Sequence, residues 1–567
     1  MSFLPISPAS TTHPVTTSIA PYWAAWPLVF FATLPWVQPW HLSPSVSAAP
    51  LLISWLCTAL LLLWGDWRPS RSASAMSAGG IALGLLIATA VAFQMGAGPE
   101  GLGLLVALAV VAACIFRFAG ANAIDISALI RAWWLAGVLS ALMGLVQYAG
   151  WSDHFAPWVS YNAGGEAYAN LRQRNLYASL TSIALCALVW LAGHDKRFQH
   201  PAWAAGWAVL LAGGNALSHS RTGLFELILI VGLSWWWGLH KVRAVCWTLV
   251  AVLPAYLVIS AGTPWLFSTG SDENMLTRLT DGTPSCMSRV ALWANVLELI
   301  QLRPWFGWGW GELDYAHFIT PYTGPRFCAI LDNAHNLPLH LAVELGVPAA
   351  LLVCAGIVWG VLRLRPWAET QAHRQLAWSV LAVLGLHSLL EYPLWYGPFQ
   401  LALGICGALL WSPSVVTRPS LLKLQRPLRG LLSALLLIGL IAVGQDYHHM
   451  RQIYLAPEQR DPAYAQDTIG QLQTVQLFKD QARFAELTLQ PLTQANAAWT
   501  YATATQLLHF SPEYRVVEKV IESAVMLGYD EQAQFYLARY RAVFPQEHTQ
   551  WSQNLRADSP TTSEDDD

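Results

Sequence analysis

Charged residues are scarce in this chain of 567 residues, and their scarcity excludes an ordinary soluble protein. Only 11% of the residues are Asp, Glu, Lys or Arg, whereas soluble domains carry about 25%. Hydrophobic residues make up 55%, and there are 30 Trp residues, a residue type that favours membrane–water interfaces. The composition predicts an all-α polytopic membrane protein.

Recognisable cofactor motifs are also missing. We find no phosphate-binding glycine loop and no zinc-ligand spacing. The GWGWG run at 307–311 lacks the lysine and the strand–helix setting of a phosphate loop, so we interpret it as a turn. We therefore expect no metal, no cofactor and no nucleic-acid partner.

Long apolar segments are what the chain has in abundance. A transmembrane helix needs about 20 mostly apolar residues, and about thirteen segments meet or approach this length. They lie near 21–38, 50–65, 79–96, 101–119, 126–149, 175–193, 203–218, 222–239, 243–262, 338–362, 374–391, 396–412 and 430–446. Lys and Arg collect in alternate short loops, which places the N-terminus inside and the end of the last helix outside.

Arginine is rare in the outer segments, so the few that occur there are informative. They are Arg172, Arg174, Arg221, Arg278, Arg289, Arg303 and Arg326. Arginines on the side that normally lacks them commonly bind phosphate or carboxylate groups.

The charge and hydropathy pattern divides the chain into six parts. We expect an N-terminal cytoplasmic segment at 1–20, a transmembrane bundle at 21–262, a long outer loop at 263–337, transmembrane helices at 338–446, an outer helical domain at 447–556 and a disordered acidic tail at 557–567. The long loop contains an amphipathic helix candidate at 288–302. Small and aromatic residues at 524–546 have the spacing of tetratricopeptide-like helix pairs.

Two of the eight cysteines stand apart from the rest. Six lie within apolar runs, whereas Cys286 and Cys328 both lie in polar sequence of the long loop. If that loop is extracytoplasmic, we expect a disulfide between them.

His335 lies in a polar cluster at the start of an apolar segment, together with Asp332, Asn333 and Asn336. Polar groups at the mouth of a membrane helix are costly, so this cluster is a candidate functional site. An imidazole with an ordinary pKa of ~6.5 is a suitable general base, and a carboxylate could orient it. The alternative is a loop histidine that only hydrogen-bonds at a helix start.

Four other segments bring polar groups to the same outer face. They contribute Arg172, Gln173, Arg174 and Asn175 (171–179), Arg221 (218–223), Arg289 (288–293), and Glu391, Tyr392 and Tyr396 (387–399). Arginines near a membrane surface suit a lipid pyrophosphate, because fixed guanidinium groups stabilise the charge that a leaving group gains. Solvated loops with snorkelling arginines and simple helix turns are the alternative interpretation.

These motifs resemble a known family. The DNAHN block at 332–336, the SHSRTG turn at 218–223 and the many-helix layout resemble the O-antigen ligase/polymerase superfamily. Within it, LRQRNLYAS at 171–179 and HSLLEYPLWYGPF at 387–399 resemble the pilin-glycosylating type of bacterial protein O-oligosaccharyltransferase. The resemblance covers about residues 20–445, and the helical C-terminal part is similar to the domain that ends those enzymes.

The resemblance implies en bloc transfer of an oligosaccharide from undecaprenyl pyrophosphate to Ser or Thr hydroxyls of periplasmic proteins such as pilin. It implies a multi-pass protein of the bacterial inner membrane, with the long loop and the C-terminal domain in the periplasm. The implied catalytic residues are His335, Gln173 and Tyr392, with Tyr396 as an alternative tyrosine. The implied donor-binding residues are Arg221 and Arg289, and the position of Arg172 and Arg174 adds these two.

Three other functions remain open from the sequence. An O-antigen ligase would transfer the glycan to lipid A–core, and an O-antigen polymerase would extend a lipid-linked chain. A lipid-linked glycan transporter is a third alternative. Transporters are commonly built from inverted repeats, and we find no internal repeat in this chain.

Overall fold

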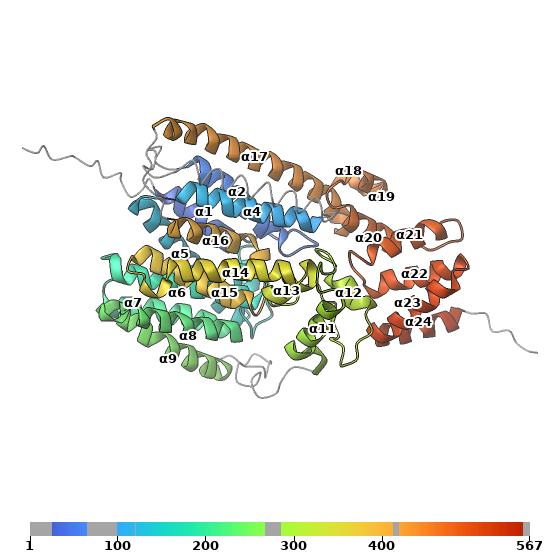
Figure 1. The fold of residues 1–567 in the computed structure, drawn as a ribbon, viewed down its shortest axis with the longest axis horizontal. Coiled ribbons are helices and arrows are strands. Elements are labelled where there is room, and N and C mark those ends of the chain that lie inside the picture. The colour runs from blue at the N-terminus through green and yellow to red at the C-terminus, as the bar shows by residue number, and fades with distance from the viewer. Residues whose placement is uncertain (1–24, 65–98, 120, 267–284, 412–418, 559–567) are drawn as a thin grey trace, which may run out of the picture.

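A computed structural model describes residues 25–64, 99–119, 121–266, 285–411 and 419–558, and these ranges consist of helices joined by loops and turns (Figure 1). Within these ranges we find an isolated bridge between Leu42 and Ser45 but no β-strand. The prediction of an all-helical chain is therefore confirmed.

Five helices of the described residues are long and apolar enough to cross a membrane. They are Ala123–Tyr148, Arg174–His194, Arg243–Thr263, Val347–Ala368 and Pro427–Tyr454. Shorter apolar helices cover Trp26–Val37, Ala48–Leu63, Gly103–Phe118 and Gly397–Leu410. The structure thus supports a helical membrane protein but does not confirm thirteen spans, and the segment predicted at 79–96 lies outside the described residues.

The bundle is arranged around α6 (Arg174–His194), whose apolar part is 89% buried. It packs against α5 (Ala123–Tyr148), α7 (Pro201–Leu217), α8 (Arg221–Trp236), α9 (Arg243–Leu266) and α15 (Ala372–Ser388). Helices α1 (Trp26–Val37), α2 (Ala48–Leu63), α4 (Pro99–Phe118) and α16 (Gly397–Leu410) complete the same core.

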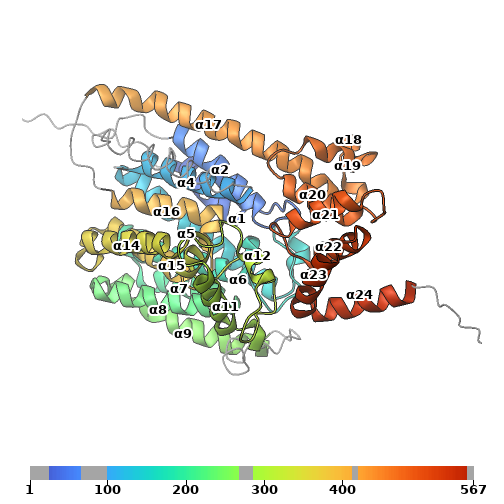
Figure 2. The ribbon, with the colours of Figure 1, turned by 45° about the vertical axis from the view of Figure 1, so that its right-hand side comes forward.

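Two apolar helices lie on the outside of this bundle. In α14 (Val347–Leu364) only 6% of the residues in the most apolar stretch are buried, and in α17 (Pro419–Arg451) only 11% of them are buried. Both views show α17 along the edge of the bundle (Figures 1 and 2). A surface of this size and apolarity would be a liability in water, so it fits contact with lipid.

The single span predicted at 338–362 is wrong, because the chain breaks at Gly346 into α13 (Leu337–Leu345) and α14. Gly346 has a positive φ of 89°, and a Cβ there would lie 2.2 Å from the carbonyl oxygen of Trp305. Trp305 precedes the GWGWG turn, which pairs with the end of α13: Trp308 N–H donates to Val343 O and Gly309 N–H to Glu344 O. Counting apolar residues along the sequence cannot detect this break, because both helices are apolar.

The C-terminal part is a set of short helices beyond one end of the bundle (Figures 1 and 2). The predicted boundary at 446 falls inside α17, which runs on to Arg451. The later helices are α18 (Pro462–Ala465), α19 (Thr468–Gln471), α20 (Lys479–Leu489), α21 (Ala497–Leu507), α22 (Tyr514–Met526), α23 (Asp530–Val543) and α24 (Pro545–Asp558). Neighbours pack in pairs, α21 on α22 and α22 on α23.

A helix of the long loop joins this C-terminal part to the bundle. The loop contains α11 (Arg289–Leu302), which matches the helix predicted at 288–302, and α12 (Leu313–Ile319). Phe318 of α12 is buried in the core of the C-terminal helices, and Arg539 Nε donates to Ile319 O at 2.8 Å. His509 contacts Glu312 at 2.7 Å. The described part of the long loop, residues 285–337, is therefore a packed connection between the two parts.

Candidate active site

His335 is held in one orientation by its own loop. Its backbone has a positive φ of 49°, a conformation that non-glycine residues rarely adopt. Asn333 stabilises it by accepting a hydrogen bond from His335 N–H at 2.8 Å, and Asn333 is itself buried. Trp293 Nε1 of α11 donates to the Ala334 carbonyl at 3.1 Å. Asn336 caps α13 through Leu339 N–H and also donates to Leu389 O.

Glu391 is the centre of the polar contacts around this histidine. Its Oε2 lies 2.7 Å from His335 Nδ1, and its Oε1 accepts hydrogen bonds from the Arg289 guanidinium and from Asn175 Nδ2. These partners come from the loop before α13, from the start of α11 and from the start of α6. Asp332, the neighbour in sequence that could have oriented His335, is exposed, and Glu391 takes that role.

The contact with Glu391 decides which nitrogen of His335 is free. An ionised carboxylate only accepts hydrogen bonds, so Nδ1 must carry the proton. Nε2 makes no hydrogen bond with the residues that the structure describes, and it holds the lone pair of the neutral ring. A base whose other nitrogen is fixed by a carboxylate is the arrangement used for general-base histidines.

The electrostatics keep this carboxylate ionised. Burial alone would raise the pKa of Glu391, but the hydrogen bond from His335 and the charge of Arg289 hold that pKa below its ordinary value. Burial, with Tyr396, Asp332 and Glu391 nearby, raises the pKa of Tyr392 above its ordinary value. Tyr392 is therefore a neutral hydrogen-bond donor near pH 7.

The depressed pKa of Glu391 gives a stability prediction with a defined sign. The ionised carboxylate should stabilise the folded state above its ordinary pKa of about 4.3, and this contribution should disappear as the pH falls through the lower folded-state value. Wild type should therefore melt at a higher Tm than Glu391→Gln at pH 7, with the difference shrinking below about pH 4. Intrinsic Trp fluorescence during heating in detergent measures both values. A difference that grows on acidification would contradict the assignment.

Tyr392 is the tyrosine that lies beside His335. The two ring centroids are 5.1 Å apart with an edge-on geometry, and Tyr396 stacks behind Tyr392 at 6.3 Å. Burial, then the carboxylates of Asp332 and Glu391, raise the pKa of Tyr396 to about 12. The geometry favours Tyr392 over Tyr396 as the residue that contacts a ligand bound at His335.

Arg289 is positioned by the first turn of α11. Ser288 caps this helix by accepting from Ala291 N–H, so Arg289 is its first residue. Three residues earlier, Cys286 is joined to Cys328 by a disulfide, with the two Cα atoms 5.4 Å apart. The bridge ties the start of α11 to the segment that leads into residues 332–336.

Arg221 reaches the same end of the bundle from α8. Ser220 caps this helix and donates to Asn175 Oδ1 at 2.7 Å, which places Arg221 next to the residue that contacts Glu391. Arg221 is exposed and makes no hydrogen bond or ion pair with the described residues. Arg221 is therefore a cation at the rim of the cluster that has no partner within the part of the chain that the structure describes.

The other two arginines proposed for the donor lie outside this cluster. The Arg172 guanidinium donates to the carbonyls of Pro39 and Trp40, and Arg174 pairs with Glu166 at 3.6 Å on the surface. Arg172 therefore fixes the loop after α1, and its expected role in donor binding is not supported by the geometry. Gln173 caps α6, with its Oε1 accepting from Leu176 N–H at 2.6 Å; its amide N–H groups are not used in that bond.

Two buried residues near the site, Ser179 and Glu226, were missed from the sequence, whereas their partner His387 lies in the polar segment 387–399 that the sequence analysis selected. A hydrogen-bonded group lies in the interior of the bundle near Glu391 and consists of Ser179, Glu226 and His387, each of which is fully buried. A lone glutamate within the apolar run of α8 was the available signal, because carboxylates are costly inside membrane helices.

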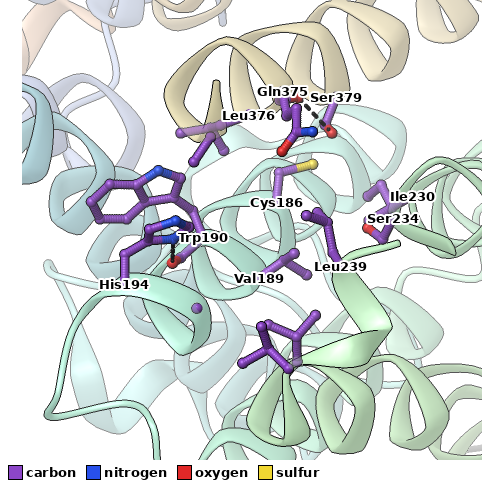
Figure 3. A pocket seen from close by; sticks show the side chains of 14 residues that line it. Cys186, Val189, Trp190, His194, Ile230, Ser234, Leu239, Gln375, Leu376 and Ser379 are labelled. Carbon is purple, nitrogen blue, oxygen red and sulfur yellow. Dashed lines mark hydrogen bonds between the residues drawn. The ribbon is translucent and has the colours of Figure 1, made fainter. Parts of the chain in front are cut away.

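A cavity opens far from these residues, near the other end of α6 (Figure 3). Trp190, His194 and Cys186 line it from α6, and Gln375, Leu376 and Ser379 line it from α15. Fifteen residues of α6 separate Asn175 from Trp190, which corresponds to roughly 22 Å of helix. The cavity shares no lining residue with the His335 cluster and is mostly apolar, so it is not the candidate site.

Comparisons with known proteins match the segments that form the cluster. Residues 206–354, which include Arg221, Arg289 and His335, match the family described as O-Antigen ligase. Residues 167–192, which include Asn175, match the family described as Protein glycosylation ligase. Residues 375–557, which include Glu391, match the family described as Virulence factor membrane-bound polymerase, C-terminal.

Two curated relatives come from Acinetobacter baylyi. One, a general O-oligosaccharyltransferase, is 26% identical over 281 residues, 48% of each chain. The other, a ComP-specific O-oligosaccharyltransferase, is 26% identical over 257 residues, 44% of each chain. The chain thus spans about half the length of the curated relatives it matches.

The described helices and the matches together indicate a helical membrane protein that resembles the O-antigen ligase class. Within this class, the match to the protein glycosylation ligases and the two relatives confirm the resemblance to the protein O-oligosaccharyltransferases.

Proposed function

We propose that this protein transfers an oligosaccharide en bloc from undecaprenyl pyrophosphate to a Ser or Thr hydroxyl of a periplasmic acceptor such as pilin. The reaction would take place at the periplasmic face of the bacterial inner membrane. The observation that carries the proposal is the convergence of His335, Arg289 and Asn175 on the single carboxylate of Glu391. The matches to protein glycosylation ligase and O-Antigen ligase support the reaction class.

The geometry suits the two halves of such a transfer. His335 Nε2 takes the proton of the acceptor hydroxyl while the hydroxyl oxygen attacks the anomeric carbon. The bond from that carbon to the pyrophosphate oxygen breaks, and the leaving pyrophosphate keeps the bonding electrons. Arg289 and Arg221 stabilise its growing negative charge, and the Tyr392 hydroxyl can donate to it. Glu391 balances the imidazolium that forms on His335.

Expression with a defined acceptor tests the acceptor class. The chain is produced in bacteria that make a lipid-linked oligosaccharide, together with a candidate pilin, and glycopeptides are identified by mass spectrometry. Pilin peptides carrying the whole oligosaccharide on Ser or Thr are the expected result. Glycan found on lipid A–core with none on protein would reject this proposal and favour the O-antigen ligase that the match to residues 206–354 also allows.

Arg221 and Arg174 form a matched pair for testing the donor site. Both are arginines at helix starts, Arg221 exposed and Arg174 partly exposed, but Arg221 adjoins the Glu391 cluster whereas Arg174 pairs with Glu166. A charge-assisted contact contributes about 1.5–3 kcal/mol. Arg221→Ala should therefore lower kcat/KM for the lipid donor about 10- to 100-fold. Arg174→Ala should change it less than about threefold.

The measurement is transfer at varied donor and fixed acceptor concentration. An equal loss in both variants would show that the effect is general surface charge. An unchanged donor KM and kcat in Arg221→Ala would remove Arg221 from the donor site.

A further inference from the structure

Helix α6 joins α8 and α15 through two polar side chains on one of its faces. Asn175 and Ser179 are four residues apart, which places them one above the other on an α-helix. At the start of α6, Ser220 donates to Asn175 Oδ1 at 2.7 Å, and Asn175 Nδ2 donates to Glu391 Oε1 at 3.2 Å.

One turn further along α6, Ser179 makes a second connection of the same kind inside the bundle. Ser179 Oγ donates to Glu226 Oε1 of α8 and lies 2.6 Å from His387 Nδ1 of α15. The side chains of Glu226 and His387 are both 0% exposed. We call Ser179, Glu226 and His387 the lower rung, and Ser220, Asn175 and Glu391 the upper rung.

Packing alone does not explain the lower rung. A carboxylate and an imidazole lose their hydration when they are fully buried, and replacing such a group by apolar side chains is often neutral or stabilising. His387 Nε2 has no hydrogen-bond partner among the described residues, so the group is not even fully satisfied. Polar groups of this kind inside membrane helices usually have a function.

The lower rung lies where it can set the geometry of the site. His387 is in the last turn of α15, and its carbonyl accepts from the Glu391 N–H at 2.7 Å. Any shift of His387 therefore moves Glu391. Glu226, the other partner of Ser179, lies on α8. Arg221 is the first residue of the same helix, directly after the Ser220 cap.

We propose that Ser179, Glu226 and His387 are positioning residues that fix the first turn of α8, with Arg221, against the end of α15, with Glu391. The proposal rests on the proposed function, because it assigns these residues to the same transfer reaction. They do not touch the reacting atoms. They hold the Arg221 guanidinium and the Glu391 carboxylate in a fixed position relative to each other.

Ser179 and Ser140 provide a matched test. Both are fully buried serines in the bundle, but Ser140 Oγ of α5 has no hydrogen-bond partner among the described residues. Ser179→Ala deletes the atom that links α8 to α15 and changes little volume. A displacement of about 1 Å can cost about 100-fold in rate. We expect kcat to fall 10- to 100-fold with a nearly unchanged acceptor KM, whereas Ser140→Ala should behave as wild type.

Conservative replacement separates positioning from simple loss of stability. Ser179→Thr keeps the hydroxyl and should recover most of the activity. The proposal is overturned if Ser179→Ala and Ser140→Ala have equal kcat values. It is also overturned if the loss of activity in Ser179→Ala follows only a loss of Tm that Ser179→Thr shares.

A distance measurement tests the proposal independently of activity. Spin labels at Phe225→Cys on α8 and Leu389→Cys after α15 occupy exposed positions, in a background without the partly exposed Cys246 and Cys354. Pulsed electron resonance should show a broadened or shifted distance in Ser179→Ala but not in Ser140→Ala. An unchanged distance would refute the positioning role. Absence of any transfer by wild type, with the distance change present, would instead refute the proposed function.

Discussion

His335→Ala should abolish measurable glycan transfer while the protein still inserts and folds. A positioned general base contributes about 100- to 10,000-fold to a rate, and the His335 imidazole, which Glu391 holds through Nδ1, lies beside Tyr392. The side chain is partly exposed and lies in a loop, so its removal leaves the helix bundle intact. Glycopeptide yield per unit of purified membrane protein measures the loss.

His335→Gln distinguishes the base from a mere ligand of the pyrophosphate. A glutamine can donate hydrogen bonds to phosphate oxygens, but it cannot accept the hydroxyl proton. If His335 is the base, both His335→Ala and His335→Gln should be inactive, with size-exclusion profiles and Tm values close to wild type. Substantial activity in His335→Gln would show that the imidazole serves binding rather than proton transfer.

Glu391→Gln should reduce kcat about 100- to 10,000-fold, nearly as much as loss of the histidine. The glutamine amide can donate to His335 Nδ1, which would force the proton onto Nε2 and remove the lone pair that accepts the hydroxyl proton. The variant also loses the negative charge that pairs with Arg289 and with the imidazolium formed during transfer.

Glu391→Asp is the matched control for this effect. It keeps the charge and the tautomer of His335 but shortens the side chain, so activity should lie between those of Glu391→Gln and wild type. Initial rates at saturating donor and acceptor give kcat for each variant. Activity of Glu391→Gln equal to that of wild type would show that neither the tautomer nor the charge matters, and the role of Glu391 would have to be abandoned.

Much of the candidate site could be predicted from motifs in the sequence. His335, Arg289, Tyr392 and Asn175 each lie in a short polar block beside an apolar helix, and such blocks are rare in a chain with so few charges. The start of α11 was also predictable, because Ser288 is a typical N-cap ahead of an amphipathic pattern.

The partners of these residues could not be predicted in the same way. Asp332 is three residues from His335, yet the carboxylate that contacts Nδ1 belongs to Glu391, which is 56 positions further along the chain. Arg172 and Arg221 looked equivalent as outer arginines, but the left-handed turn at Arg172 directs its guanidinium to the carbonyls after α1. Such differences depend on how helices pack, which residue patterns do not encode locally.

The break at Gly346 illustrates a third case. The apolar run through α13 and α14 is continuous in composition, so it predicts a single span. Only the close approach of the Trp305 carbonyl shows why a glycine must interrupt it. The same packing brings the GWGWG turn against α13 and so supports the helix that follows His335.

The intact mass of a purified acceptor tests the central claim most directly. The chain is reconstituted in proteoliposomes with undecaprenyl-pyrophosphate-linked oligosaccharide and a purified pilin, without other enzymes. We predict that wild type adds the mass of one whole oligosaccharide to the pilin, and that His335→Ala and Glu391→Gln add none or nearly none. An unmodified pilin with wild type, while the same preparation glycosylates lipid A–core or lengthens the lipid-linked glycan, would contradict the proposed protein acceptor.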